Sequence, residues 1–169
     1  MDSFSLLIAV LLISSGYSFL GTKSSKGIRA TGAVLHSLPH YYGLFAGLLS
    51  ALPALVLLTI LGIGDGIIFD QLALEFVPDD VKASESYKEV IVLAQIYNVV
   101  NGINFGEQPD WVHAAAEAWH GWEATSTTLK TVTVLALSLI GGMLAYRMVN
   151  PDFRSRNAVE RIVMTILAA

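Results

Sequence analysis

The stretch YYGLFAGLLSALPALVLLTILGIG, residues 41–64, decides the fold because it contains no charged side chain. An apolar helix needs about 20 residues to cross the roughly 30 Å of hydrocarbon in a bilayer. Residues 41–64 meet that length, and two further apolar runs, residues 3–22 and 129–149, come close to it. The sequence therefore predicts an all-α membrane protein with three transmembrane helices.

The composition of the chain supports this class. Of its 169 residues, 54% are hydrophobic and 14% are charged, whereas about 25% of the residues of a soluble domain are charged. The first apolar run follows Asp2 instead of a basic segment, and no small-residue cleavage site precedes Lys23. We therefore expect a retained membrane anchor, with a cleaved signal peptide as the alternative. Cysteine is absent, which excludes disulfides and cysteine metal ligands.

Basic residues gather at one end of each predicted span. They follow the first span as Lys23, Lys26 and Arg29, and they follow or end the third span as Arg147, Arg154, Arg156 and Arg161. Cytoplasmic loops of membrane proteins carry an excess of lysine and arginine. The pattern predicts a membrane protein with its N-terminus outside, a cytoplasmic linker at residues 23–40, and a cytoplasmic linker and the start of a further membrane helix at residues 150–169.

The segment between the second and third spans, residues 65–128, is strongly acidic. It contains eleven carboxylates against two lysines, a local balance of −9. Nucleic acid is excluded as a partner of this segment because a phosphate backbone requires the opposite charge. The same charge opposes binding of phosphate, so we predict that this segment does not bind phosphate itself.

Residues 65–128 are expected to be helical and extracytoplasmic. Residues 67–77 resemble a short amphipathic element that ends at Pro78, and residues 81–100 form a helix with Asp79 or Asp80 as its N-cap. The apolar part of that helix, residues 90–100, is too short and too polar for a fourth span.

A turn is predicted at residues 101–108, and one helix, or two coaxial ones, from Asp110 to about Arg147. The three tryptophans of that helix are expected to mark the outer membrane interface or a packing seam against the helix at residues 81–100; they are Trp111, Trp119 and Trp122. Asn150 and Pro151 end the third span. Asn157 is then expected to cap a last helix with a membrane-type apolar face, and we expect the chain to continue beyond Ala169.

One candidate metal set is present. His113, Glu117 and His120 share one face of the predicted helix, and two imidazoles with one carboxylate are possible zinc ligands. Their spacing differs from the H-E-x-x-H pattern of zinc peptidases. We interpret them as the polar face of the helix and assign no metal site to them.

The remaining polar residues are given structural roles. His36 and His40 are predicted to anchor the inner membrane edge, whereas Asp65 and Asp70 fall outside the predicted hydrocarbon region. No Ser-His-Asp arrangement, G-x-S-x-G turn or phosphate-binding glycine loop accompanies the serines and threonines. The sequence therefore predicts a protein that is not an enzyme, with no catalytic and no cofactor-binding residues and no cofactor.

Two motifs resemble a known family. LHSLPHYYGLFAGLLSALPALVLL, residues 35–58, and NPDFRSRNAVERIV, residues 150–163, are similar to the N-terminal region of PstC-type permeases, the membrane subunits of phosphate-importing ABC transporters. The resemblance covers the chain in order, and the acidic segment matches in length and character. It implies a location in the bacterial inner membrane and a non-catalytic part of a phosphate permease that precedes the transport core and serves assembly or docking.

The resemblance also implies partners: membrane lipid, the second permease and the ATPase of an ABC transporter, and a periplasmic phosphate-binding protein. No functional residue of the family maps onto this chain, because the transport core would lie beyond Ala169. An alternative is the extracytoplasmic input domain of a signalling receptor, and a third is an intramembrane enzyme. The sequence that follows Ala169 would distinguish them, since further apolar spans would continue a permease and a kinase or coiled coil would continue a receptor.

Overall fold

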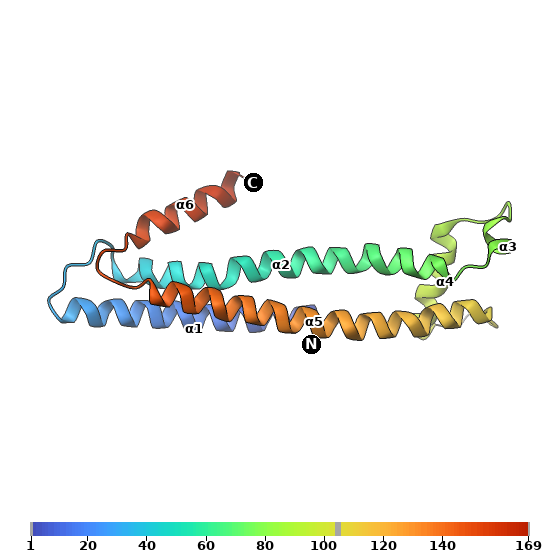
Figure 1. Cartoon of the computed structure of the whole chain (residues 1–169), viewed down its shortest axis with the longest axis horizontal. Coiled ribbons are helices and arrows are strands. Elements are labelled where there is room, and N and C mark those ends of the chain that lie inside the picture. The colour runs from blue at the N-terminus through green and yellow to red at the C-terminus, as the bar shows by residue number, and fades with distance from the viewer. Residues whose placement is uncertain (1, 104–105, 169) are drawn as a thin grey trace. The chain divides into compact units, whose positions relative to one another are not determined.

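The computed structural model describes residues 2–103 and 106–168, and its elements in these ranges are all helices. The predicted all-α class is confirmed. Figure 1 shows the six helices in chain order: α1 (Ser3–Ala30), α2 (Pro39–Glu75), α3 (Asp79–Lys82), α4 (Glu89–Val100), α5 (Asp110–Arg147) and α6 (Ser155–Ala168). Three of them, α1, α2 and α5, are long and apolar enough to cross a membrane.

The chain divides into two compact units, which are described separately. The first, here called the membrane unit, comprises Met1–Thr59 and Lys130–Ala169. The second, here called the acidic unit, comprises Ile60–Leu129. Helices α2 and α5 each contribute one part to both units, so the chain enters and leaves the acidic unit within continuous helices.

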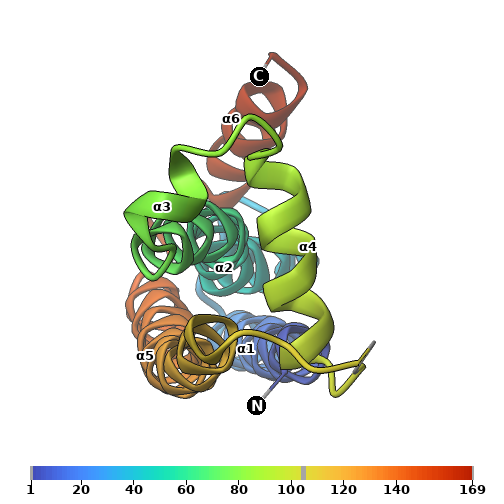
Figure 2. The same cartoon turned by 90° about the vertical axis from the view of Figure 1, so that its right-hand side faces the viewer.

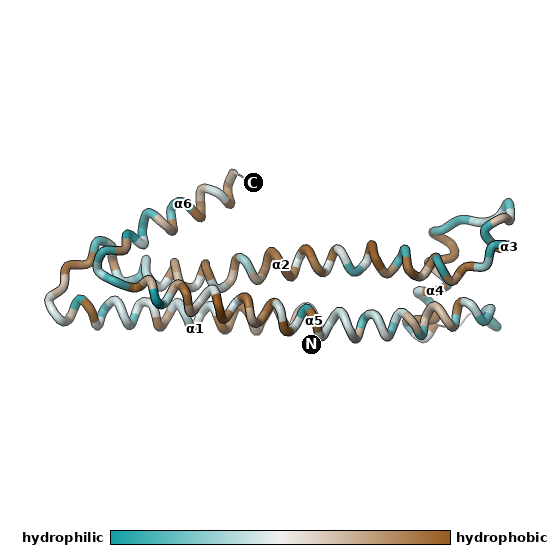
Figure 3. The backbone as a smooth tube through the Cα atoms, viewed as in Figure 1, coloured by the Kyte–Doolittle hydropathy of each residue, from teal (hydrophilic) through white to brown (hydrophobic). Residues whose placement is uncertain are grey.

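Large apolar side chains cover the outside of the membrane unit. Leu12 of α1 is 68% exposed, Val56 of α2 is 57% exposed and Val132 of α5 is 62% exposed. Figure 3 shows hydrophobic residues along α2 and along the part of α5 that belongs to the membrane unit, and more polar residues at the connection between α5 and α6. Exposed apolar surface on this scale is unfavourable in water, whereas lipid chains would cover it.

The interior of the membrane unit combines an aliphatic cluster with close contacts at small residues. In the cluster, Leu6 and Val10 pack with Ala54, Leu58 and Val134. Elsewhere the backbones of neighbouring helices approach closely. A Cβ atom added at Gly43 of α2 would collide with the Thr22 side chain of α1, and one at Gly141 of α5 would collide with the carbonyl oxygen of Leu49 in α2. Contacts between small residues are typical of helix packing within membranes.

A buried hydrogen bond joins two of these helices. The Ser50 hydroxyl of α2 donates to the carbonyl oxygen of Ser138 in α5 at 3.0 Å, and the two hydroxyl oxygens lie 3.1 Å apart. Both residues are fully buried. Hydroxyl groups inside a membrane bundle need such partners because lipid offers none.

The helices are longer than the predicted spans. Helix α1 begins after Asp2, whose carboxylate accepts from the Ser5 amide at 3.2 Å, and it continues beyond residue 22 to Ala30. Lysine and serine are tolerated inside a helix, so the helix ends only where Gly32 adopts φ +86°. The irregular part of the predicted linker 23–40 is therefore short, and Pro39 begins α2, a position that suits a residue without an amide hydrogen.

The prediction of a short amphipathic element at residues 67–77, separate from the second span, is wrong. Helix α2 continues through Gly62, Gly64 and Gly66 to Glu75, so residues 67–77 are not a separate element. Each glycine disfavours a helix by about 1 kcal/mol. Burial of Phe69 and Ala73 in the core of the acidic unit offsets this cost.

The predicted helix at residues 81–100 is divided. Residues 79–82 form α3, residues 83–88 are irregular, and α4 begins at Glu89. The Ser84 hydroxyl donates to the Val81 carbonyl at 2.8 Å, and such bonds compete with helix continuation. Pro78 occupies the N-cap position of α3, so Asp79 and Asp80 lie in its first turn instead of capping it.

Of the two alternatives predicted for Asp110 to about Arg147, one helix or two coaxial ones, the structure has the single helix α5. Helix α6 begins at Ser155, so Asn157 lies in its first turn and is not its cap. In the predicted turn at residues 101–108, Gly102 and Gly106 have φ +73° and +83°, as a turn requires. Residues 104 and 105 of that turn lie outside the described residues.

Candidate functional site

Two connections of the membrane unit are joined by side-chain hydrogen bonds. The connection between α1 and α2 contributes His36, whose Nδ1 lies 2.8 Å from the carbonyl oxygen of Pro151. A carbonyl only accepts, so this Nδ1 carries the hydrogen. The Tyr42 hydroxyl, in the first turns of α2, donates to the Phe153 carbonyl at 2.9 Å, with the Asn150 carbonyl at 3.3 Å as a second acceptor.

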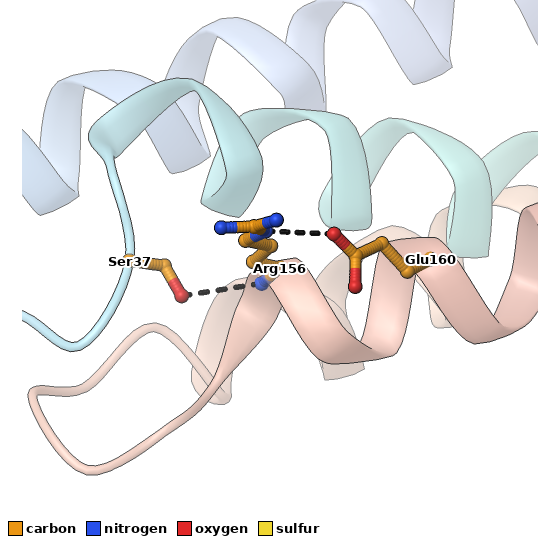
Figure 4. Close-up of polar contacts among 3 residues, drawn as sticks. All are labelled: Ser37, Arg156 and Glu160. Carbon is orange, nitrogen blue, oxygen red and sulfur yellow. Dashed lines mark hydrogen bonds and ion pairs between the residues drawn. The ribbon is translucent and has the colours of Figure 1, made fainter.

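The start of α6 is held in the same place. The backbone amide of Arg156 donates to the Ser37 hydroxyl at 3.2 Å, and Figure 4 shows Ser37 approaching the first turn of α6 from the other connection. Amides in the first turn of a helix lack partners within the helix. Ser37 therefore does for α6, across 119 positions of sequence, what an N-cap residue usually does for its own helix.

Apolar packing completes this arrangement. The centroid of the Phe153 ring lies 4.8 Å from the centroid of the Phe45 ring and 6.4 Å from that of the Tyr42 ring. Val159 of α6 joins Phe45 and Ala145 in a buried cluster. We call the group His36, Ser37, Tyr42, Phe153 and Arg156 the helix clasp. It fixes the direction in which α6 leaves the end of α5.

Replacing Tyr42 with phenylalanine should weaken the helix clasp. The ring would remain packed, but the Phe153 carbonyl would lose its donor, which costs about 1 kcal/mol for a typical hydrogen bond. We expect faster protease cleavage of the connection at residues 148–154 in detergent micelles. Tyr146→Phe is the matched control because Tyr146 is exposed on α5. Equal cleavage rates for both variants would contradict the assignment.

The acidic unit has a core built from three helices. It contains Phe69, Ala73 and Val77 near the end of α2, Val92 and Ile96 of α4, and Val112, Ala115 and Trp119 of α5. Figure 2 shows α4 beside the end of α2 and the beginning of α5. The centroid of the Trp119 ring lies 4.9 Å from that of the Tyr97 ring and 5.4 Å from that of the Phe69 ring, and both contacts are edge to face. Trp119 thus packs against α4, as one of the two predicted arrangements requires, whereas the Trp122 ring contacts Phe69 and Phe76.

Two aspartates of the acidic unit accept short hydrogen bonds. The Tyr97 hydroxyl donates to Asp70 at 2.6 Å, and the Ser126 hydroxyl lies 2.7 Å from both carboxylate oxygens of Asp65. Burial, followed by the hydrogen bond and charge of Asp70, raises the pKa of Tyr97 to about 12. These contacts link the helices of the unit, since Asp70 and Asp65 lie on α2, Tyr97 lies on α4 and Ser126 lies on α5.

The raised pKa of Tyr97 predicts a pH dependence. In the unfolded chain the phenol titrates at its ordinary value of 10.0, and in the folded chain at about 12. The contribution of Tyr97 to stability is therefore complete below pH 10 and is lost as the pH rises from 10 to 12. Tyr97→Phe should remove the tyrosinate absorbance step near pH 12, whereas Tyr87→Phe should leave it in place. A wild-type titration without a step above pH 11 would contradict the assignment.

The candidate zinc residues do not form a site. His113, Glu117 and His120 are all exposed on α5, and in residues 2–103 and 106–168 no group of three or more potential ligands is close enough to hold a metal ion. His40 lies at the start of α2 against the ring of Tyr41, at 4.3 Å. The sequence interpretation missed the helix clasp, because nothing local marks Ser37 or Tyr42 as a partner of residues more than 100 positions away.

The structure defines a helical membrane protein with three long apolar helices and a separate helical unit between the second and the third. Residues 6–169 match the family model described as phosphate ATP-binding cassette transporter. The chain therefore belongs to that family. No curated protein and no solved structure matches the chain. The family agrees with the resemblance that the two sequence motifs indicated, and it implies other transporter subunits as partners.

Proposed function

We propose that the chain is the membrane-embedded N-terminal part of a PstC-type permease that imports inorganic phosphate, and that it serves assembly without catalysing a reaction. The family match over residues 6–169 of a chain with three apolar helices carries this proposal. It also favours a transporter over a signalling receptor. In the proposed topology the N-terminus and the acidic unit are extracytoplasmic, and both connections of the helix clasp are cytoplasmic.

The packing of the membrane unit supports an assembly role. Glycine contacts bring α1, α2 and α5 together, and the helix clasp sets the direction of α6. On α6, Val159 is buried, whereas Met164 and Leu167 are 70% and 79% exposed. A helix that is fixed at its start and apolar along its later turns can position further membrane segments or subunits.

Isolation of the chain from its native membrane tests the assembly role. The tagged protein is extracted in a mild detergent, and the proteins that copurify are quantified against an unrelated membrane protein with the same tag. We expect an ABC-type ATPase and a second permease subunit in fixed proportion to the chain. Recovery of neither, or of a histidine kinase in their place, would contradict the proposal.

We further propose that the acidic unit helps a periplasmic phosphate-binding protein to dock. Its charge is the supporting observation, since Glu85, Glu89, Glu117 and Glu123 are all exposed. Charged surfaces steer encounter and accelerate association at low salt. Replacing these four residues with glutamine should slow association by about tenfold at low salt and weaken its salt dependence. Glu160→Gln, in the membrane unit, is the control, and an unchanged rate in the fourfold variant would exclude docking.

A further inference from the structure

A cavity of about 580 Å³ lies in the membrane unit beside the helix clasp. Its lining includes Arg29 from the last turn of α1, His36 and Ser37 from the following connection, Tyr41 from the first turn of α2, and Arg156 from the first turn of α6. The stretch of residues 29–41 and Arg156, which is far away in sequence, thus place two guanidinium groups and an imidazole around one hollow. The described part of the chain contributes no acidic residue to this lining.

Both guanidinium groups can donate to a ligand. In the ranges that the structure describes, no carboxylate lies within ion-pair distance of Arg29. Arg156 uses its Nε to donate to Glu160 at 2.7 Å, in a pair whose side chains are 62% and 52% exposed. The terminal N–H groups of Arg156 are not used by that bond (Figure 4). An arginine fork presents several donors in one plane, which suits the oxygens of a phosphate group.

Two of the three helix ends at the cavity, the N-termini of α2 and α6, favour an anion, and the third, the C-terminus of α1, carries a partial negative charge that Arg29 in its last turn offsets. Helix α2 begins at Pro39 and α6 at Ser155, and residues of both first turns line the cavity. The N-terminus of a helix carries a partial positive charge. The rim is apolar, because Val34 and Leu38 also line the cavity and are 83% and 55% exposed. An anionic group bound here would therefore have apolar surface next to it.

We propose that this cavity binds a phosphate group, carried either by an anionic lipid headgroup or by inorganic phosphate. The volume is in the range of ligand sites, about 300–1,000 Å³, and accommodates either source. Basic pockets between the cytoplasmic ends of membrane helices bind lipid phosphates in this way. The apolar rim at Val34 and Leu38 provides a surface for the start of an acyl chain. This inference is independent of the proposed transport function, since it depends only on the membrane unit.

Equilibrium binding to the full chain in a non-ionic detergent tests the proposal. The probes are short-chain phosphatidylglycerol, short-chain phosphatidylcholine and sodium phosphate, measured by microscale thermophoresis. We expect saturable binding of phosphatidylglycerol, of inorganic phosphate, or of both, and weaker binding of phosphatidylcholine. Saturation by phosphatidylglycerol alone assigns the cavity to a lipid headgroup, and saturation by phosphate assigns it to the ion.

Matched variants locate the binding. The double variant Arg29→Gln/Arg156→Gln should weaken binding by about tenfold or more, as expected for the loss of charge-assisted hydrogen bonds. Arg154→Gln/Arg161→Gln removes the same charge from exposed residues outside the cavity and should change binding by less than about twofold. Glu160→Gln, which leaves the cavity lining intact, should tighten binding because Arg156 loses its competing partner.

Three results would overturn the proposal. They are the absence of saturable binding by either phosphate probe, equal weakening in both double variants, and equal affinity for phosphatidylglycerol and phosphatidylcholine without saturation by inorganic phosphate. Should Arg29→Gln/Arg156→Gln fail to fold, the Glu160→Gln variant decides, and unchanged or weaker binding by it would count against the cavity.

Discussion

Replacing Trp119 with alanine is expected to release α4 from the acidic unit. Trp119 is 7% exposed, and its ring is in edge-to-face contact with Phe69 of α2 and Tyr97 of α4. Truncation of a buried tryptophan typically costs about 3–5 kcal/mol because the cavity left behind does not close fully. The amides of α4 should then exchange with solvent about 100-fold faster or more, since each 1.4 kcal/mol is a factor of ten. Hydrogen exchange followed by mass spectrometry measures this change.

The control for Trp119 is its neighbour in sequence. His120 is exposed on the same helix, so His120→Ala should leave exchange in residues 89–100 within about twofold of the wild-type rate, because exposed substitutions away from special features usually change stability by less than 0.5 kcal/mol. A Trp119→Ala variant with wild-type exchange in α4 would show that the acidic unit is not held together by this core.

Replacing Gly141 with alanine is expected to separate α5 from α2. The added Cβ would collide with the carbonyl oxygen of Leu49 and would lie 3.5 Å from the Cα of Ser50. These are backbone atoms, so no side chain can rotate away, and the buried hydrogen bond from Ser50 to Ser138 would lengthen. Overpacking of this kind costs about 1–3 kcal/mol. Thermal unfolding in detergent, followed by helical circular dichroism, should show a lower melting temperature.

A second glycine of the same helix provides the matched control. An added Cβ at Gly121 would meet no atom within 4 Å, so Gly121→Ala should gain the higher helix propensity of alanine, up to about 1 kcal/mol. The two substitutions are chemically identical and should act in opposite directions. Equal melting temperatures for both variants would show that the close approach of α5 to α2 is not needed for stability.

The spans and the helical class were predictable because their signals are local. A run of apolar residues long enough to cross a membrane, such as residues 41–64, identifies a span without any knowledge of its neighbours. The continuous helix α5 was predictable for a related reason, since no proline and only three glycines, Gly121, Gly141 and Gly142, lie between Asp110 and Arg147. The tryptophan seam was one of two alternatives, because an indole suits a membrane interface and a packing contact equally well.

Helix boundaries were harder to predict because packing overrides local propensity. Gly62, Gly64 and Gly66 are ordinary signs of a helix end, yet α2 continues because residues beyond them are buried against α4 and α5. Ser84 acted in the opposite direction and helped to end α3 where apolar residues alone predicted one long helix.

The helix clasp could not be read from the sequence at all. His36 and Pro151 are 115 positions apart, and Ser37 and Arg156 are 119 apart. His36, Ser37 and Pro151 lie in the connections and Arg156 lies in the first turn of α6, and no local motif marks any of them. Pro39 and Pro151 do indicate where the connections lie, but only the packing of α1, α2 and α5 brings the connections together. The cavity lined by Arg29 and Arg156 arises from the same packing and was missed for the same reason.

Cysteine labelling tests the central claim, that three spans place the acidic unit outside and both basic connections inside. The chain contains no cysteine, so Thr31→Cys, Ser86→Cys and Asn157→Cys each introduce a single thiol at an exposed position. In intact spheroplasts a membrane-impermeant maleimide should label only Ser86→Cys, and the other two should react only after permeabilisation. Labelling of Thr31→Cys or Asn157→Cys in intact spheroplasts, or protection of Ser86→Cys, would contradict this topology.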